Sequence, residues 1–228
     1  AAKMPRIAWR ICVAQFESGS KTGSYSHKPR WRSDGYGFGE PVVDNETREF
    51  ARSALDMALR WKHHNRETLG DLVAHHAHLP ESAQESIWML VESWSEEATD
   101  NDRCWMREKI RVSSFTRRAI KRAEKRDLNR SREMAHQVYD ALLPSDALLK
   151  HSWLFKAQWI DESVDDFEEE DLDYRKREER ILAQRREALK EILDDCGIEG
   201  VLQMAEMGET SNLIGWLLSG LIDDDEAL

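Results

Sequence analysis

The fold is decided by residues 151–218, which open with the aromatic segment His151-Ser152-Trp153-Leu154-Phe155. After an acidic stretch, a charged segment with helical spacing begins near Tyr174 and stops at Cys196-Gly197. Two short apolar segments, 201–205 and 213–218, follow it. Because glycine commonly ends a helix, this order predicts one long helix and then two short ones. It is typical of a scaffold, and nothing in it resembles an active site.

The aromatic segment predicts a buried anchor. Trp153, Phe155 and Trp159 carry too much apolar area to be left in water, and we expect all three to be substantially buried.

The rest of the chain repeats the helical pattern, with apolar residues three and four positions apart. We expect Asn45 to cap the second helix and Ser145 to cap a short helix before His151. A break is expected near Ser113-Ser114. No run of alternating β-branched residues requires a sheet. The predicted helical segments are 5–16, 46–64, 67–78, 80–94, 100–127 and 130–143.

These segments predict an all-α fold of stacked antiparallel helical hairpins, a short HEAT-like α-solenoid; a closed helical bundle is the alternative. The stack is favoured because the apolar faces are narrow stripes, between which the nine tryptophans can wedge. We expect three parts: an N-terminal helix and Gly/aromatic-rich loop (1–45), helical hairpins (46–145), and a C-terminal helical subdomain with an acidic linker (146–228).

Composition limits the function classes. The 44 acidic and 33 basic residues give a net charge of −11, which argues against general affinity for nucleic acid or an anionic membrane. The apolar runs are far shorter than the roughly 20 residues of a membrane span. Three dispersed cysteines indicate reduced, buried thiols, and we expect a cytoplasmic protein with no membrane partner.

The chain offers no motif for catalysis or for a cofactor. The segment 19–23 lacks the Gly-Lys-Ser/Thr order of a phosphate loop. The histidines at 63–64 and 75–78 lack zinc-ligand spacing with an intervening glutamate, and His76 is expected in the core. We therefore expect no enzyme activity, metal or cofactor in this chain.

Charge is distributed unevenly along the chain. Residues 161–173 contain nine carboxylates and no basic residue, whereas 103–132 contain twelve basic and three acidic residues. The simplest interpretation is two solvated faces. Alternatively, the acidic residues Glu168, Glu169, Glu170 and Asp171 cover the basic region, or one of the two segments binds a partner of opposite charge. Six basic residues form a helical stripe that could follow phosphates: Arg117, Arg118, Lys121, Arg122, Lys125 and Arg126.

A glycine- and aromatic-rich loop is expected between residues 18 and 43. We expect its residues His27, Arg30, Trp31 and Arg32 to form an ordered turn packed on the helices; a partner-binding loop is the alternative.

Two stretches resemble a known class of protein. One is Ser26-His27-Lys28-Pro29-Arg30-Trp31-Arg32; the other runs from Trp153-Leu154-Phe155 through Arg185-Arg186-Glu187-Ala188-Leu189 to Ile214-Gly215. Both resemble helical-repeat regions of large bacterial multidomain proteins, in which a STAND-type NTPase or a sirtuin-like effector is fused to an α-solenoid. The resemblance implies a sensor or scaffold segment in stress signalling or anti-phage defence. It carries over no catalytic residue.

Two functional hypotheses follow. The first is a non-enzymatic interaction module of a larger bacterial protein, which binds another protein or neighbouring domains of the same polypeptide. The second is a nucleic-acid-binding helical module that uses the basic stripe within 103–132.

The acidic cover can be tested by replacing Glu168, Glu169, Glu170 and Asp171 with serine. Exposed ion pairs contribute only about 0–1 kcal/mol each, so a cover would be held weakly and its loss should expose the stripe. The variant should then elute from heparin at higher salt than the parent. Elution at the same salt, after allowing for the changed net charge, would favour two solvated faces.

Overall fold

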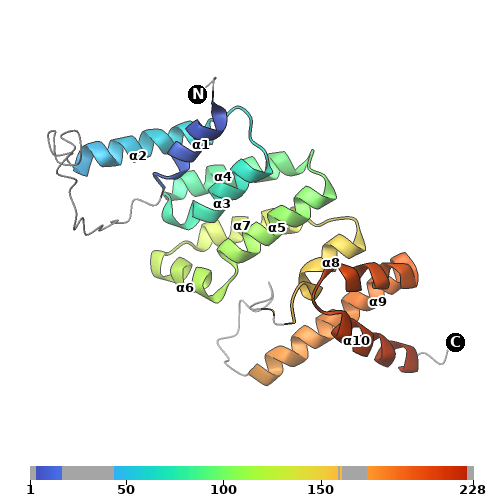
Figure 1. The fold of residues 1–228 in the computed structure, drawn as a ribbon. Helices are drawn as coiled ribbons and strands as arrows, with labels where there is room; N and C mark the ends of the chain where they lie inside the picture. The colour runs from blue at the N-terminus through green and yellow to red at the C-terminus, as the bar shows by residue number, and fades with distance from the viewer. Residues whose placement is uncertain (1–3, 17–43, 159, 161–173, 225–228) are drawn as a thin grey trace, which may run out of the picture. The chain divides into compact units, whose positions relative to one another are not determined.

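The computed structural model describes residues 4–16, 44–158, 160 and 174–224 (Figure 1). Within these ranges helix is the only regular secondary structure, so the predicted all-α fold is confirmed. The chain divides into two compact units, Ala1–Ile87 and Trp88–Leu228, called here the N-terminal and C-terminal units. The division into 1–45, 46–145 and 146–228 stays a prediction.

The N-terminal unit contains α1 (Pro5–Val13), α2 (Asp44–Leu59), α3 (Arg66–His75), the 3-10 helix η1 (His76–His78) and the start of α4 (Glu81–Ser95). Helix α1 packs against α2 and α3. Asn45 does not cap α2, because the helix already includes Asp44. The predicted extension of this helix to residue 64 is also wrong, because α2 ends at Leu59. Asn65 then caps α3 with its side chain.

Trp9 joins the helices of the N-terminal unit. Its indole is buried and its Nε1–H donates to the Asp71 carboxylate at 2.7 Å. The Trp61 ring meets it edge-on, with ring centroids 5.4 Å apart. His76 is buried as predicted, and its Nδ1 lies 2.7 Å from the carbonyl oxygen of Val73, to which it donates. Each of these two buried polar side chains therefore has a partner.

The first part of the C-terminal unit contains the end of α4, α5 (Asp100–Ser114), α6 (Arg117–Arg126) and α7 (Asn129–Ala141). The predicted break near Ser113-Ser114 is confirmed by the end of α5. Thr116 caps α6 by accepting a hydrogen bond from the backbone N–H of Ala119. Phe115, which is buried at the corner, stacks on His136.

The second part of this unit contains α8 (Ala147–Phe155), α9 (Tyr174–Met207) and α10 (Ser211–Asp224). The predicted cap at Ser145 is wrong, because Asp146 accepts from the N–H of Leu149 at the start of α8. Ser145 is used differently: its N–H and hydroxyl both donate to the Asp100 carboxylate. This contact ties the loop before α8 to the start of α5.

Helix α9 is two helical segments joined at Gly197 (Figure 1). Gly197 has φ 66° and ψ −168°, a conformation open essentially to glycine alone. The predicted stop at this position is therefore confirmed. After the break the helix resumes and continues to Met207.

The helices α8, α9 and α10 share one hydrophobic core. Helix α9 packs against both of the others. Phe155 is completely buried, as predicted, whereas Trp153 is only partly buried at the edge of the core, and Trp159 lies outside the described residues. The central core side chains are Leu154, Phe155, Leu189, Ile192, Met204, Ile214 and Leu217.

The carbonyl groups at the end of α8 are bound by residues far along the chain. Arg185 of α9 is 4% exposed; its Nε donates to the carbonyl of Leu154, and one terminal nitrogen donates to those of Ala157 and Gln158, all within 2.9–3.1 Å. The hydroxyl of Thr210 donates to the Phe155 carbonyl at 2.6 Å. Burial lowers the pKa of Arg185. The bonds to Leu154 and Phe155 replace the intrahelical partners that a helix end lacks, and those to Ala157 and Gln158 bind the segment that follows α8.

Replacing Arg185 with Met should lower the free energy of unfolding by about 2–4 kcal/mol, because a buried carbonyl left without a donor costs about 1–3 kcal/mol. The neighbouring Arg186 is exposed, so Arg186→Met is a control of matched charge and size. Urea unfolding followed by circular dichroism measures both. Equal midpoints for the two variants would show that the Arg185 bonds contribute little.

Gly208 is required because its backbone lies against the end of α8. A β-carbon at this position would overlap the carbonyl oxygen of Phe155, which is backbone and cannot move aside alone. We expect Gly208→Ala to destabilise the chain by about 1–3 kcal/mol. By contrast, a β-carbon at Gly215 of α10 meets nothing within 4 Å, so Gly215→Ala should be neutral or stabilising by up to about 1 kcal/mol. Thermal melting of the two variants checks this difference in sign.

Candidate functional site

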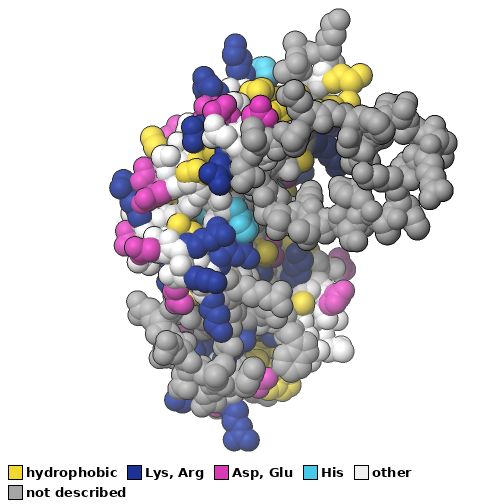
Figure 2. Space-filling model, turned by 90° about the vertical axis from the view of Figure 1, so that its left-hand side faces the viewer, with side chains coloured by type: hydrophobic (Ala, Val, Ile, Leu, Met, Phe, Trp, Pro, Cys, Tyr) yellow, Lys and Arg dark blue, Asp and Glu magenta, His cyan; other side chains and the backbone are white. Residues whose placement is uncertain are grey.

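The predicted basic stripe lies on α6. Lys121, Lys125 and Arg126 are exposed, Arg122 is half-buried, and the first helical turn includes Arg117 and Arg118. Ala119 of the same helix is buried, on the side away from Lys121. Glu124 is exposed on the same helix. Figure 2 shows that Lys and Arg side chains are interspersed with Asp and Glu over one face of the molecule.

The other predicted site residues lie outside the described ranges. These are His27, Arg30, Trp31 and Arg32 of the loop, and Glu168, Glu169, Glu170 and Asp171 of the acidic segment. Their roles stay predictions.

A pocket of about 310 Å³ lies within the C-terminal unit. Its walls come from α5, α7, α8 and the end of α9 with the turn that follows. Much of the wall is aromatic or sulfur-containing, which gives it a large apolar surface. The apolar side chains that line it include Trp105, Tyr139, Trp153, Phe155, Met204 and Met207.

The charged side chains of the lining are mostly cationic. Arg107, Arg111, Lys150 and Lys156 line the pocket, whereas Glu108 supplies a carboxylate among the described lining residues. A positive surplus in a mainly apolar recess attracts anionic groups more strongly than the same charges would on an open surface. The pocket is therefore positive although the whole chain is acidic.

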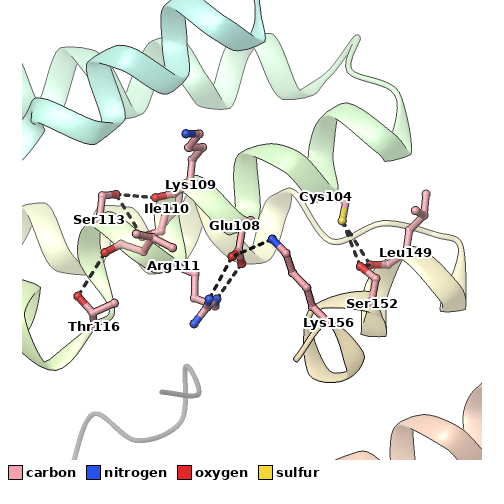
Figure 3. Close-up of polar contacts among 11 residues, drawn as sticks. Cys104, Glu108, Lys109, Ile110, Arg111, Ser113, Thr116, Leu149, Ser152 and Lys156 are labelled. Carbon is pink, nitrogen blue, oxygen red and sulfur yellow. Dashed lines mark hydrogen bonds and ion pairs between the residues drawn. The ribbon is translucent and has the colours of Figure 1, made fainter. Parts of the chain in front are cut away.

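Glu108 interacts with two of the cations (Figure 3). Its oxygens accept from Nε and a terminal nitrogen of Arg111 at 2.9 and 3.1 Å, a bidentate pair along α5. The Nζ of Lys156 lies 3.9 Å from the same carboxylate, and the Lys156 side chain is 72% exposed. Glu108 thus orders Arg111 firmly and Lys156 loosely.

Lys150 is paired outside the pocket lining. Its Nζ lies 2.6 Å from Glu191 of α9, whose other oxygen is 2.8 Å from Nε2 of His151. Hydrogen bonds from Lys150 and His151 lower the pKa of Glu191. Burial lowers the pKa of His151 despite the opposing effect of Glu191, so the imidazole is neutral near pH 7 and donates its Nε2–H. This cluster fixes α8 on α9.

Arg107 is held by Tyr139 of α7. An N–H of its guanidinium donates to the Tyr139 carbonyl, and the guanidinium carbon lies 3.6 Å from the centre of the Tyr139 ring. Burial raises the pKa of Tyr139, so the phenol is neutral and does not offset the Arg107 charge. Within the described residues, no carboxylate pairs with Arg107.

Cys104 lies in the pocket wall and is half-buried. Its Sγ is 3.5 Å from both the carbonyl of Leu149 and the hydroxyl of Ser152 (Figure 3). Cys12 is buried, as predicted, but Cys196 is exposed beside the break at Gly197. The prediction that each cysteine is buried is therefore wrong for Cys196 and only partly met for Cys104.

The pocket is not predicted by the sequence, because its lining residues lie far apart in the chain. One local signal does exist. Cys104, Arg107, Glu108 and Arg111 recur at three- and four-residue spacing, so they share one face of α5. In the sequence, Arg107 and Arg111 belong to the basic region 103–132, and only the packed structure separates this face of α5 from α6.

The described part of the chain contains no group of three or more His, Cys, Asp or Glu side chains placed to hold a metal ion. Its helices include none with the length and apolar character needed to cross a membrane. Comparison with protein-family models, curated proteins and solved structures finds no match for the chain.

Proposed function

We propose that this chain is a non-enzymatic helical scaffold and interaction module, and that the pocket of the C-terminal unit receives a segment of a protein partner. The observation that carries the proposal is the composition of the pocket wall. Trp, Tyr, Phe, Met and Arg are the residues enriched at the centres of protein interfaces, where a few buried anchors supply most of the binding energy. Here they converge on one recess.

The wider setting of the module is also part of the proposal. The resemblance to helical-repeat regions supports a cytoplasmic segment of a larger bacterial protein, acting as a sensor or scaffold in stress signalling or anti-phage defence. The partner is then another protein or a neighbouring domain of the same polypeptide.

Nucleic-acid binding through α6 is the second candidate. It is favoured by the exposed cations Lys121, Lys125 and Arg126 on one helix. It is opposed by Glu124 and Asp127 nearby and by the net charge of −11. The first proposal is preferred because phosphate contacts alone do not account for the aromatic pocket.

Peptide binding can be tested with the thiols of Cys104 and Cys196 as reporters. A display library of random 12-residue peptides is selected on the full 228-residue chain. A selected peptide at ten times its Kd should slow alkylation of Cys104 about tenfold by occupancy. Cys196 is exposed outside the pocket lining, so its rate should be unchanged. Mass spectrometry of alkylated peptides measures both rates in one sample.

The proposal fails if no peptide is enriched over an empty support, or if enriched peptides leave the Cys104 rate unchanged. Filter binding of duplex and single-stranded DNA at two salt concentrations tests the second candidate. Phosphate contacts require a steep salt dependence, which Lys121→Gln with Lys125→Gln should reduce.

A further inference from the structure

Arg107 is a cation that the described protein orients but does not neutralise. It is half-buried in the pocket wall, and the carbonyl and ring of Tyr139 hold its guanidinium in one position. A guanidinium has five N–H donors, and Tyr139 engages it through its backbone carbonyl and its side chain. Donors are therefore left for a ligand.

The other cations of the pocket are already engaged to different extents. Arg111 forms its bidentate pair with Glu108, and Lys150 is bound by Glu191 at 2.6 Å. Lys156 lies at a loose 3.9 Å from Glu108 and is largely exposed. An anion that enters the pocket would thus find two available cations. Lys156 is loosely held and exposed, whereas Arg107 is fixed by Tyr139.

The chemistry of a fixed guanidinium favours a carboxylate. Its planar arrangement of donors matches two carboxylate oxygens, and such charge-assisted bonds are stronger than neutral ones. Because Tyr139 already orders the side chain, little conformational entropy is lost when the ligand binds. A partly desolvated site also strengthens the attraction.

The surrounding wall adds a second requirement. Trp105, Trp153, Met204 and Met207 present apolar surface beside the cations, and methionine adapts readily to different shapes. The volume of about 310 Å³ is at the small end of the range for ligand pockets. The pocket suits one large apolar side chain and an adjacent anionic group, which a short peptide segment supplies.

We propose that the pocket selects a partner segment in which an Asp or Glu stands next to a large apolar or aromatic residue, with the carboxylate bound by Arg107. This inference rests on the proposed function, because it names the kind of segment that the interaction module receives. It makes Arg107 the residue that determines specificity, with Lys156 assisting at the rim.

The test uses the peptides selected on the wild-type chain. Among them, those that protect Cys104 should carry Asp or Glu beside Trp, Phe, Leu or Met. Changing that acid to its amide should weaken binding to the wild-type chain about tenfold or more, as measured by fluorescence anisotropy, because a hydrogen bond to a charged group is lost. In Arg107→Gln the acid and amide peptides should bind within about twofold of each other. Lys121→Gln, outside the pocket on α6, should keep the wild-type ratio.

The outcomes separate the inference from the proposed function. If acid and amide peptides bind the wild-type chain equally while Cys104 is protected, acid selection is wrong and peptide binding stands. If no peptide protects Cys104, both fail. If Arg107→Gln keeps the acid preference, the assignment to Arg107 is overturned. Should Arg107→Gln unfold, Arg107→Lys, which loses the planar donors, should reduce the ratio, and an unchanged ratio would overturn the assignment.

Discussion

The buried guanidinium of Arg185 is the contact on which the C-terminal unit depends. It donates to carbonyls at the end of α8 and in the segment that follows it, while Thr210, directly before α10, donates to the Phe155 carbonyl. A helix end placed in a core without such donors would be costly. The same bonds set the position of Phe155 and of Lys156, which line the pocket. The hydrogen bonds of Arg185 and Thr210 thus determine both the packing of α8 on α9 and the shape of the pocket.

Local signals predict that the chain is helical and where several helices end, whereas a contact with a distant residue explains the error at Ser145. The stop at Gly197 and the break near Ser113-Ser114 are predicted from neighbouring residues in the sequence, and both are confirmed. The prediction that Ser145 caps α8 is wrong because its hydroxyl instead donates to Asp100, 45 positions earlier. The pocket could not be predicted for the same reason: Arg107 and Tyr139 are 32 positions apart, and their contact exists only after α5 and α7 pack.

Total charge and local charge lead to different expectations in this protein. The net charge of −11 argues against anionic partners in general. In the pocket, however, the carboxylate of Glu108 is engaged by Arg111, Lys150 is paired with Glu191 outside the lining, and Arg107 has no carboxylate partner in the part of the chain that is described. At short range the arrangement of pairs outweighs the total, because distant charges are screened within about 10 Å at moderate salt.

The close approach of Gly208 to the backbone of Phe155 restricts which substitutions this chain can accept during evolution. Any side chain at position 208 forces the end of α8 to withdraw, and a withdrawn α8 can no longer reach Arg185 or Thr210. Positions 185, 208 and 210 should therefore change together or not at all among diverging relatives. Residues that only line the pocket can be substituted one at a time, whereas a substitution at position 185, 208 or 210 requires compensating changes at the other two.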